Sequence, residues 1–176
     1  MEIVKKNEYE LNNLEKAGLQ TLLKSAFPDC LSSRIYFKQL PHFRLIGSIE
    51  NTIIGQVGVD HRVISLNGNS KSIFGIIDLC VDSAHKRKGL AEEMILEIES
   101  LAKENKIDFI VLFADDQRLY HRLGFQSVSN RCKWLGIDEH KTVGIIQDSL
   151  ADCMMIKKTG NSEWQNEDVD MLGYLF

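Results

Sequence analysis

Apolar residues recur along the chain with two different periods, and the changes of period mark the elements that the sequence predicts. Between residues 7 and 26 they are spaced as on one face of a helix, so we expect a first helix after a short initial strand. Residues 30–40 lie between Pro28 and Pro41. Because proline ends helices more readily than it continues them, a second, short helix is expected there. The stretch 89–105 carries an apolar stripe at helical spacing and predicts a further helix.

Strands are predicted where the period falls to two. Alternating residues over 43–49, a turn at Glu50 and Asn51, and the apolar stretch 52–64 predict a hairpin. Asn67 and Gly68 both tolerate positive φ, so they predict a tight turn into a third antiparallel strand over 72–82. Residues 108–114 form an apolar run typical of a strand buried on both faces. Residues 116–125 predict a short helix that ends at a glycine, and residues 151–158 predict another strand.

These elements predict one mixed α/β domain over residues 1–176, with a mostly antiparallel central sheet and helices on both faces. The formal charge of -4 gives no broad electrostatic footprint for nucleic acid. No apolar stretch has the length of a signal peptide or a membrane span, so we expect a cytoplasmic protein without a membrane partner. The cysteines are too far apart for a zinc site or a disulfide scaffold, so we expect reduced thiols and no metal; they are Cys30, Cys80, Cys132 and Cys153.

A basic turn between a strand and the helix at 89–105 is the segment with the most chemical information. The N–H groups of a first helical turn have no intrahelical partners, so residues 86–91 could hold a pyrophosphate with help from the helix dipole. Two other interpretations stay open at this point: Gly89 serves only the turn, and Lys86, Arg87 and Lys88 are a solvated cluster. The turn matches neither a P-loop nor a dinucleotide-binding fingerprint.

The stretch LCVDSAHKRKGLA resembles the acetyl-CoA-binding motif of the GNAT superfamily, a strand followed by [QR]-x-x-G-x-[GA] at a helix start. The motif is filled by Lys86, Arg87, Lys88, Gly89, Leu90 and Ala91. Lys86 stands where the family has Gln or Arg, and Ser83 stands where proline is common. A second GNAT segment is resembled by FIVLFADDQRLYHRLGF, with matches at Leu119, Tyr120, Gly124 and Phe125. The resemblance implies a GNAT fold with one splayed parallel strand pair, acetyl-CoA as co-substrate and no metal.

The same resemblance implies roles for individual residues. Backbone N–H groups near Leu79 and Val81 would polarise the thioester carbonyl, and Cys80 would line the coenzyme on the same strand. Tyr120 would protonate the departing sulfur; the alternative is that it only packs beneath the coenzyme. Relatives place a glutamate nearer Ile77, so Asp78 would act as general base only if a β-bulge re-aims it, and a water chain is the alternative.

The C-terminal segment is acidic and contains a tryptophan. It resembles the C-terminal part of the aminoglycoside 2'-N-acetyltransferases, which implies an acceptor site made by Trp164 with Glu167, Asp168 or Asp170. The alternative is that this segment seals the edge of the sheet. The sequence thus predicts an N-acetyltransferase for a small, cationic amine, with a homodimer as a candidate assembly. The other hypotheses are an acetyl-CoA-binding sensor, an acetyltransferase for protein N-termini or lysines, and an unrelated α/β phosphate-binding protein.

Overall fold

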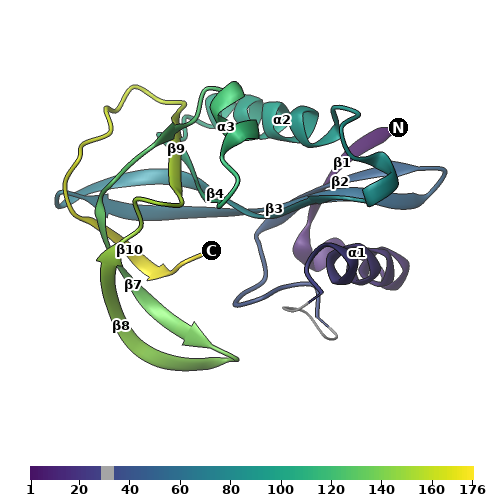
Figure 1. Cartoon of the computed structure of the whole chain (residues 1–176), viewed down its shortest axis with the longest axis horizontal. Helices are drawn as coiled ribbons and strands as arrows, with labels where there is room; N and C mark the ends of the chain where they lie inside the picture. Colours follow the sequence, from purple (N-terminus) through teal and green to yellow (C-terminus); the bar gives the residue numbers. More distant parts are fainter. Residues whose placement is uncertain (29–33) are drawn as a thin grey trace. The chain divides into compact units, whose positions relative to one another are not determined.

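The structure is a computed structural model that describes residues 1–28 and 34–176 (Figure 1). Contacts divide the chain into two compact units: residues 1–60 with 77–98, called unit 1, and residues 61–76 with 99–176, called unit 2. Strands β3 and β4 and helix α2 contribute residues to both units, and the single domain over 1–176 stays a prediction. Among the described residues, no helix has the length and apolar composition needed to cross a membrane.

Unit 1 contains all or part of four strands and two helices, together with two short 3-10 helices. Their bounds are β1 (Glu2–Asn7), η1 (Glu8–Glu10), α1 (Asn13–Ala26), β2 (Phe43–Ile49), β3 (Thr52–Leu66), β4 (Asn69–Val81), η2 (Ser83–His85) and α2 (Leu90–Glu104), of which β3, β4 and α2 continue into unit 2. Strand β2 pairs with β1 on one side and with β3 on the other. Glu50 and Asn51 have φ of 48° and 66°, so the predicted turn between β2 and β3 is confirmed.

Two paired glycines let α2 approach the β2–β3 hairpin closely. Gly47 lies opposite Gly55, and a Cβ at either would come within 2.9 Å of the Leu90 side chain. Helix α1 packs on the other face, where a Cβ at Gly18 would lie 3.0 Å from Ile53. The two helices thus lie on opposite faces of β2 and β3 (Figure 1), as the sequence predicted, and β2 is buried from both sides.

The predicted second helix is wrong for its described part. Residues 34–40 form bends without helical hydrogen bonds, while residues 30–33 lie outside the described residues. The Ile35 carbonyl accepts a hydrogen bond from the buried Arg44 side chain, and the Phe37 ring packs edge-on against Phe27 at 5.8 Å. The segment is therefore held by contacts with other parts of the chain, which override its local tendency to form a helix.

Unit 2 is built on a curled mixed sheet with strand order β6-β9-β5-β4-β3-β10-β7-β8. Its further elements are β5 (Phe109–Phe113), α3 (Arg118–Arg122), β6 (Gln126–Ser127), β7 (Arg131–Asp138), β8 (Lys141–Ser149), β9 (Met154–Lys158) and β10 (Val169–Tyr174). The predicted parallel pair is present, with Ile73–Gly75 of β4 registered against Phe109–Val111 of β5. A second parallel pair joins β10 to β7, and the other pairs in unit 2 with a described register are antiparallel.

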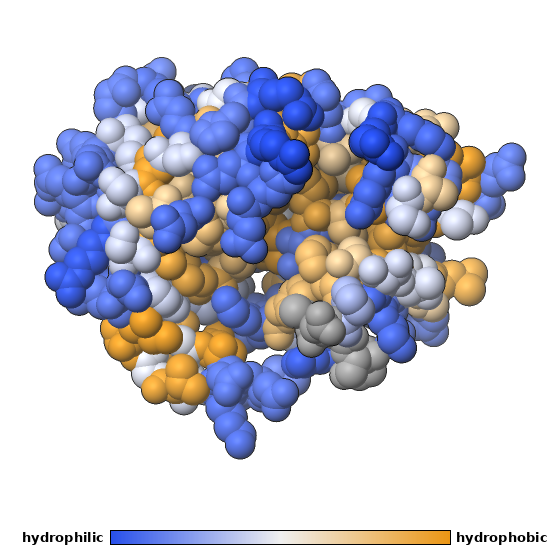
Figure 2. Space-filling view, in the orientation of Figure 1, coloured by the Kyte–Doolittle hydropathy of each residue, from blue (hydrophilic) through white to orange (hydrophobic). Residues whose placement is uncertain are grey.

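The core of unit 2 lies between strands from distant parts of the sequence. It contains Ile64, Leu66, Ile73, Phe109, Val111, Cys132, Met154, Ile156, Val169 and Met171. Strand β8 lies at the end of the strand order and is largely exposed, with apolar side chains gathered on it (Figure 2); Val143 is 60% exposed and Ile145 67%. Among the described cysteines, Cys80, Cys132 and Cys153 are free thiols, as predicted, whereas Cys30 lies outside the described residues.

Candidate active site

The basic turn in unit 1 begins at an ordered cap. One Asp82 carboxylate oxygen accepts a hydrogen bond from the Ala84 amide at 3.0 Å and lies 2.9 Å from Nδ1 of His85. Residues 86–89 follow as an exposed turn, in which Arg87 has a φ of 61° and Gly89 a φ of 90°. Helix α2 then starts at Leu90. The turn therefore ends in a left-handed residue at the helix start, a position that favours glycine.

The start of α2 has the features of an anion-binding site. The first amides of an α-helix have no intrahelical partner. Here the backbone amide of Glu93 donates to the Gly89 carbonyl at 2.9 Å, as in a regular first turn. A Cβ at Gly89 would meet one atom within 4 Å, a Glu93 carboxylate oxygen at 3.8 Å, so the space above the turn is open. Three exposed cations precede the helix, and the negative charges of Glu92 and Glu93 in its first turn partly offset them. The residues present fit a diphosphate group held by backbone amides and a small excess of positive charge.

Asp78 interrupts the regular backbone of β4. Its φ is 50°, in the left-handed region, so the two-residue alternation of side chains breaks at this position. One carboxylate oxygen, Oδ2, is buried and has no hydrogen-bond partner among the described residues. Burial raises the pKa of this carboxyl from 3.8 to about 6, against the opposing positive charges of Arg44 and Lys38. A carboxylate in this state is poised to take a proton near neutral pH.

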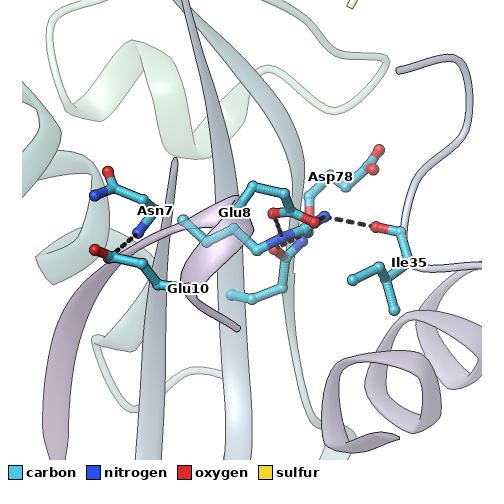
Figure 3. Close-up of polar contacts among 7 residues, drawn as sticks. Asn7, Glu8, Glu10, Ile35 and Asp78 are labelled. Atoms are coloured by element: carbon cyan, nitrogen blue, oxygen red, sulfur yellow. Dashed lines mark hydrogen bonds and ion pairs between the residues drawn. The ribbon is translucent and has the colours of Figure 1, made fainter. Parts of the chain in front are cut away.

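A buried polar network lies beneath Asp78 (Figure 3). Arg44 donates to both carboxylate oxygens of Glu8, at 2.7 and 3.2 Å, to the Ile35 carbonyl at 2.7 Å, and to the Gln56 side chain at 2.8 Å. Gln56 in turn donates to the Asp78 backbone carbonyl at 2.5 Å. The Asp78 carboxylate points away from this cluster (Figure 3). The network thus contacts the peptide of Asp78 while its carboxylate is left for another partner.

The remaining predicted residues of β4 are Leu79, Cys80 and Val81. Cys80 and Val81 are buried and Leu79 is half-buried, and the Asp82 amide after the strand donates to the Ile54 carbonyl of β3 at 2.8 Å. Burial raises the pKa of the Cys80 thiol to about 12, although a hydrogen bond with Gln56 opposes the shift. Because the thiolate is the nucleophilic form, Cys80 is a structural residue rather than a covalent acyl carrier.

Tyr120 lies in unit 2 on the short helix α3. Its ring packs edge-on against Phe125, with 5.6 Å between the centroids, and its backbone carbonyl accepts from the Phe125 amide at 3.0 Å. Gly124, at a φ of 83°, ends the helix as predicted. Burial and the negative charge of Asp116 raise the pKa of Tyr120 to about 12, so its phenol keeps its proton at neutral pH.

The acidic C-terminal residues are divided between structural contacts and solvent. The Trp164 indole N–H donates to the buried Asn130 side chain at 2.9 Å, and its ring packs edge-on against Phe109 at 5.0 Å. Asp170, on β10, forms an ion pair with Lys133 at 2.5 Å. The side chains of Glu167 and Asp168 are exposed. The structure thus gives Trp164 and Asp170 contacts within unit 2, and the acceptor role of the segment stays a prediction.

Four residues around Asp78 were not predicted from sequence: Glu8, Lys38, Arg44 and Gln56. Arg44 and Gln56 are 1% and 0% exposed. Both are polar residues within strands of mostly apolar or small residues, and this pattern is the sequence feature that could have pointed to them. Glu8 and Lys38 lie outside such strands and carry no local signal. No group of three His, Cys, Asp or Glu side chains suited to a metal ion occurs within the part of the chain that the structure describes.

Comparisons with known proteins identify a family and a fold. A model of the family described as Acetyltransferase (GNAT) domain matches residues 15–128. The fold resembles that of a GNAT N-acetyltransferase, YhbS, from Escherichia coli in complex with CoA, with a TM-score of 0.62 and 16% identity over 96% of this chain and 89% of that one. It also resembles an aminoglycoside 6'-N-acetyltransferase with coenzyme A, with a TM-score of 0.65 and 13% identity over 93% and 99% of the two chains. A Brucella melitensis GNAT acetyltransferase with acetyl-CoA gives a TM-score of 0.54 and 16% identity over 71% and 83%. No curated protein sequence matched the chain.

Proposed function

The chain belongs to the GNAT acetyltransferase family, and we propose that it transfers the acetyl group of acetyl-CoA directly to a primary amine of a small, cationic molecule. The observation that carries this proposal is Asp78, a partly buried carboxyl with a raised pKa and one buried, unpaired oxygen, on the strand that leads into the basic turn. A binding-only module has no need of such a group, because a buried, unpaired carboxylate costs stability.

The coenzyme site is assigned to the start of α2. Backbone amides from Arg87 to Ala91 would hold the pyrophosphate, with Lys86, Arg87 and Lys88 adding positive charge. Residues Leu79 to Val81 would line the pantetheine arm, and their amides would polarise the carbonyl under attack. The bound coenzyme supplies the acetyl thioester.

Asp78 and Tyr120 are assigned the two proton transfers. As the amine nitrogen bonds to the acetyl carbon it becomes acidic, and Asp78, ionised at pH 7, takes its proton. The carbon–sulfur bond then breaks, and the leaving thiolate takes a proton from the phenol of Tyr120. Tyr120 is protonated at neutral pH, so its phenol has a proton to donate once the sulfur carries negative charge. The role of Tyr120 rests on the family motif.

The acceptor is proposed to be cationic for two reasons. The C-terminal segment presents the exposed carboxylates Glu167 and Asp168, and the chain carries a formal charge of -4. One structure with the same fold is named an aminoglycoside 6'-N-acetyltransferase, and aminoglycosides carry several amines. Aminoglycosides and polyamines are therefore the first acceptors to test.

The experiment combines calorimetric titration of acetyl-CoA with a thiol-release assay over aminoglycosides, polyamines and neutral amines. We expect turnover with a cationic amine. Beyond the fall of kcat/KM that protonation of the amine itself causes, we expect an acidic limb below about pH 6, where Asp78 becomes protonated. Asp78→Asn should keep acetyl-CoA affinity, lower turnover by about 10²-fold to 10⁴-fold and remove the acidic limb. Asp138 is exposed, so Asp138→Asn is the matched control and should change neither turnover nor the acidic limb. Coenzyme binding without turnover on any amine would support the sensor, and full turnover in Asp78→Asn would show that Asp78 is not the base.

A further inference from the structure

We propose that Gln56, together with the buried pair of Arg44 and Glu8, positions the catalytic carboxylate by holding the Asp78 peptide in its left-handed conformation. This inference rests on the proposed function, in which Asp78 takes the proton from the amine. The three side chains are distant in sequence, yet they form one chain of hydrogen bonds that ends on the Asp78 carbonyl.

The chemistry of the donors sets the orientation of the Gln56 amide. Arginine has donors and no acceptor, so the Gln56 atom that faces Arg44 must be the carbonyl oxygen, at 2.8 Å from Nη1. The NH₂ group of Gln56 then points to the Asp78 carbonyl, 2.5 Å away. Arg44 therefore determines which end of the amide meets Asp78, and a donor is presented to that carbonyl.

Glu8 and Ile35 hold Arg44 in place. Glu8 accepts two hydrogen bonds from the guanidinium, and the Ile35 carbonyl accepts a third. Arg44 is 1% exposed and Glu8 is 8% exposed. Because a buried ion pair stabilises a fold little compared with apolar residues of the same volume, a role in holding one geometry accounts for it better than stability does.

The Asp78 backbone is the element that needs such support. A residue other than glycine is uncommon at positive φ, and aspartate is among the residues that tolerate it best. A regular strand would alternate the side chains across its two faces, so the left-handed turn of the chain at Asp78 re-aims the carboxylate. The hydrogen bond from Gln56 acts on the carbonyl of this residue and stabilises the re-aimed state.

The network also sets the charge around the carboxyl. Arg44 on β2 and Lys38 in the segment 34–40 both lower the pKa of Asp78 against the effect of burial, and Cys80 lies on the same strand. Glu8 compensates the charge of Arg44. A new negative charge at position 56 should therefore raise the pKa of Asp78, and loss of the Glu8 charge should lower it.

The test is the acidic limb of the kcat/KM profile in Gln56→Glu and Glu8→Gln. Gln56→Glu removes the donor to the Asp78 carbonyl and adds a charge, so the limb should move up by about one pH unit. Turnover at pH 7 should fall about tenfold, with the KM for acetyl-CoA within about twofold of wild type. Glu8→Gln should move the limb in the opposite direction. The carbon-13 NMR titration of the Asp78 carboxyl should show the same two shifts in the absence of substrate.

Asn130→Asp is the matched control, because Asn130 is also a buried amide that donates to backbone carbonyls, those of Gln165 and Glu167. It should destabilise the fold without moving the limb or the NMR titration. An unmoved limb and titration in both network variants, with Asp78→Asn lacking the limb, would overturn the positioning role and leave the proposed function intact. A limb that persists in Asp78→Asn would instead overturn the assignment of Asp78 as base. If Gln56→Glu does not fold, Glu8→Gln carries the same test.

Discussion

Asp78→Asn is expected to stabilise the protein at neutral pH while it removes catalysis. The folded state holds the pKa of Asp78 at about 6, above the value of 3.8 for an unfolded chain, so folding favours the protonated carboxyl. The folded protein is therefore most stable, as far as this group is concerned, below about pH 4. This stability is lost as the pH rises from about 4 to about 6 and stays lost above it.

The size of the effect follows from the two pKa values. Each pKa unit corresponds to about 1.4 kcal/mol, so a rise from 3.8 to about 6 costs about 3 kcal/mol once the carboxyl is ionised. Asparagine is neutral at every pH and tolerates the left-handed conformation, but its NH₂ group also needs partners, which costs about 1 kcal/mol. The net gain at pH 8 is about 2 kcal/mol, or about 4–8 °C in Tm for a chain of this length.

The assay is thermal and urea unfolding of both proteins at pH 4 and pH 8, at constant ionic strength. The gain should be present at pH 8 and absent at pH 4, where the wild-type carboxyl is already protonated in the fold. Asp82→Asn is the control, because the hydrogen bond with His85 lowers the pKa of Asp82 and its substitution should give no gain at pH 8. Equal stability of Asp78→Asn and wild type at both pH values would refute the interpretation of Asp78 as a buried, destabilising carboxylate.

Three further variants test the other assignments. Gly89→Asp adds a negative charge at a φ of 90°, so it should weaken acetyl-CoA binding at least about tenfold by calorimetry in a folded protein; unchanged affinity would exclude this turn as the pyrophosphate site. Tyr120→Phe should lower kcat about 10-fold to 1000-fold with acetyl-CoA affinity retained, and full turnover would make Tyr120 a packing residue. The double variant Glu167→Gln/Asp168→Asn spares the paired Asp170 and should raise the KM of a cationic acceptor more at low salt than at 0.5 M. An unchanged KM at both salt levels would assign these two side chains no acceptor role.

Elements with local signals were predictable from the sequence. The turns at Glu50–Asn51 and Asn67–Gly68 each lie between two strands and contain Asn or Gly, which tolerate positive φ. All four turn residues have positive φ in the structure. Helix α2 was predicted within one residue at each end, because its apolar stripe is continuous and a glycine precedes it. The GNAT motifs lie in the same category, since a pyrophosphate held by backbone amides requires a short, contiguous pattern.

Elements that depend on distant partners were not predictable. Strand β10 is inserted between β3 and β7, with residues more than 30 positions away as its partners, and its own six residues have a mixed pattern. Strand β8 is exposed along most of its length, so it lacks the buried face that produces alternation. In the segment 34–40, the Ile35 carbonyl accepts a hydrogen bond from Arg44, and the Phe37 ring packs against Phe27. Neither contact is visible in the local sequence.

Asp78 shows why the proposed general base is harder to predict than the proposed coenzyme site. The GNAT resemblance implies that the glutamate of relatives corresponds to a position nearer Ile77, and by strand alternation Asp78 would face the other way. Its left-handed φ breaks that alternation, and the groups that accompany this conformation come from residues 8, 44 and 56, which belong to three other elements. A base must combine burial, an unpaired oxygen and a tuned pKa, and each of these depends on neighbours from several segments. Backbone amides at a helix start need only the helix, so the coenzyme motif can be read from one short stretch, whereas the candidate base becomes apparent only in the folded chain.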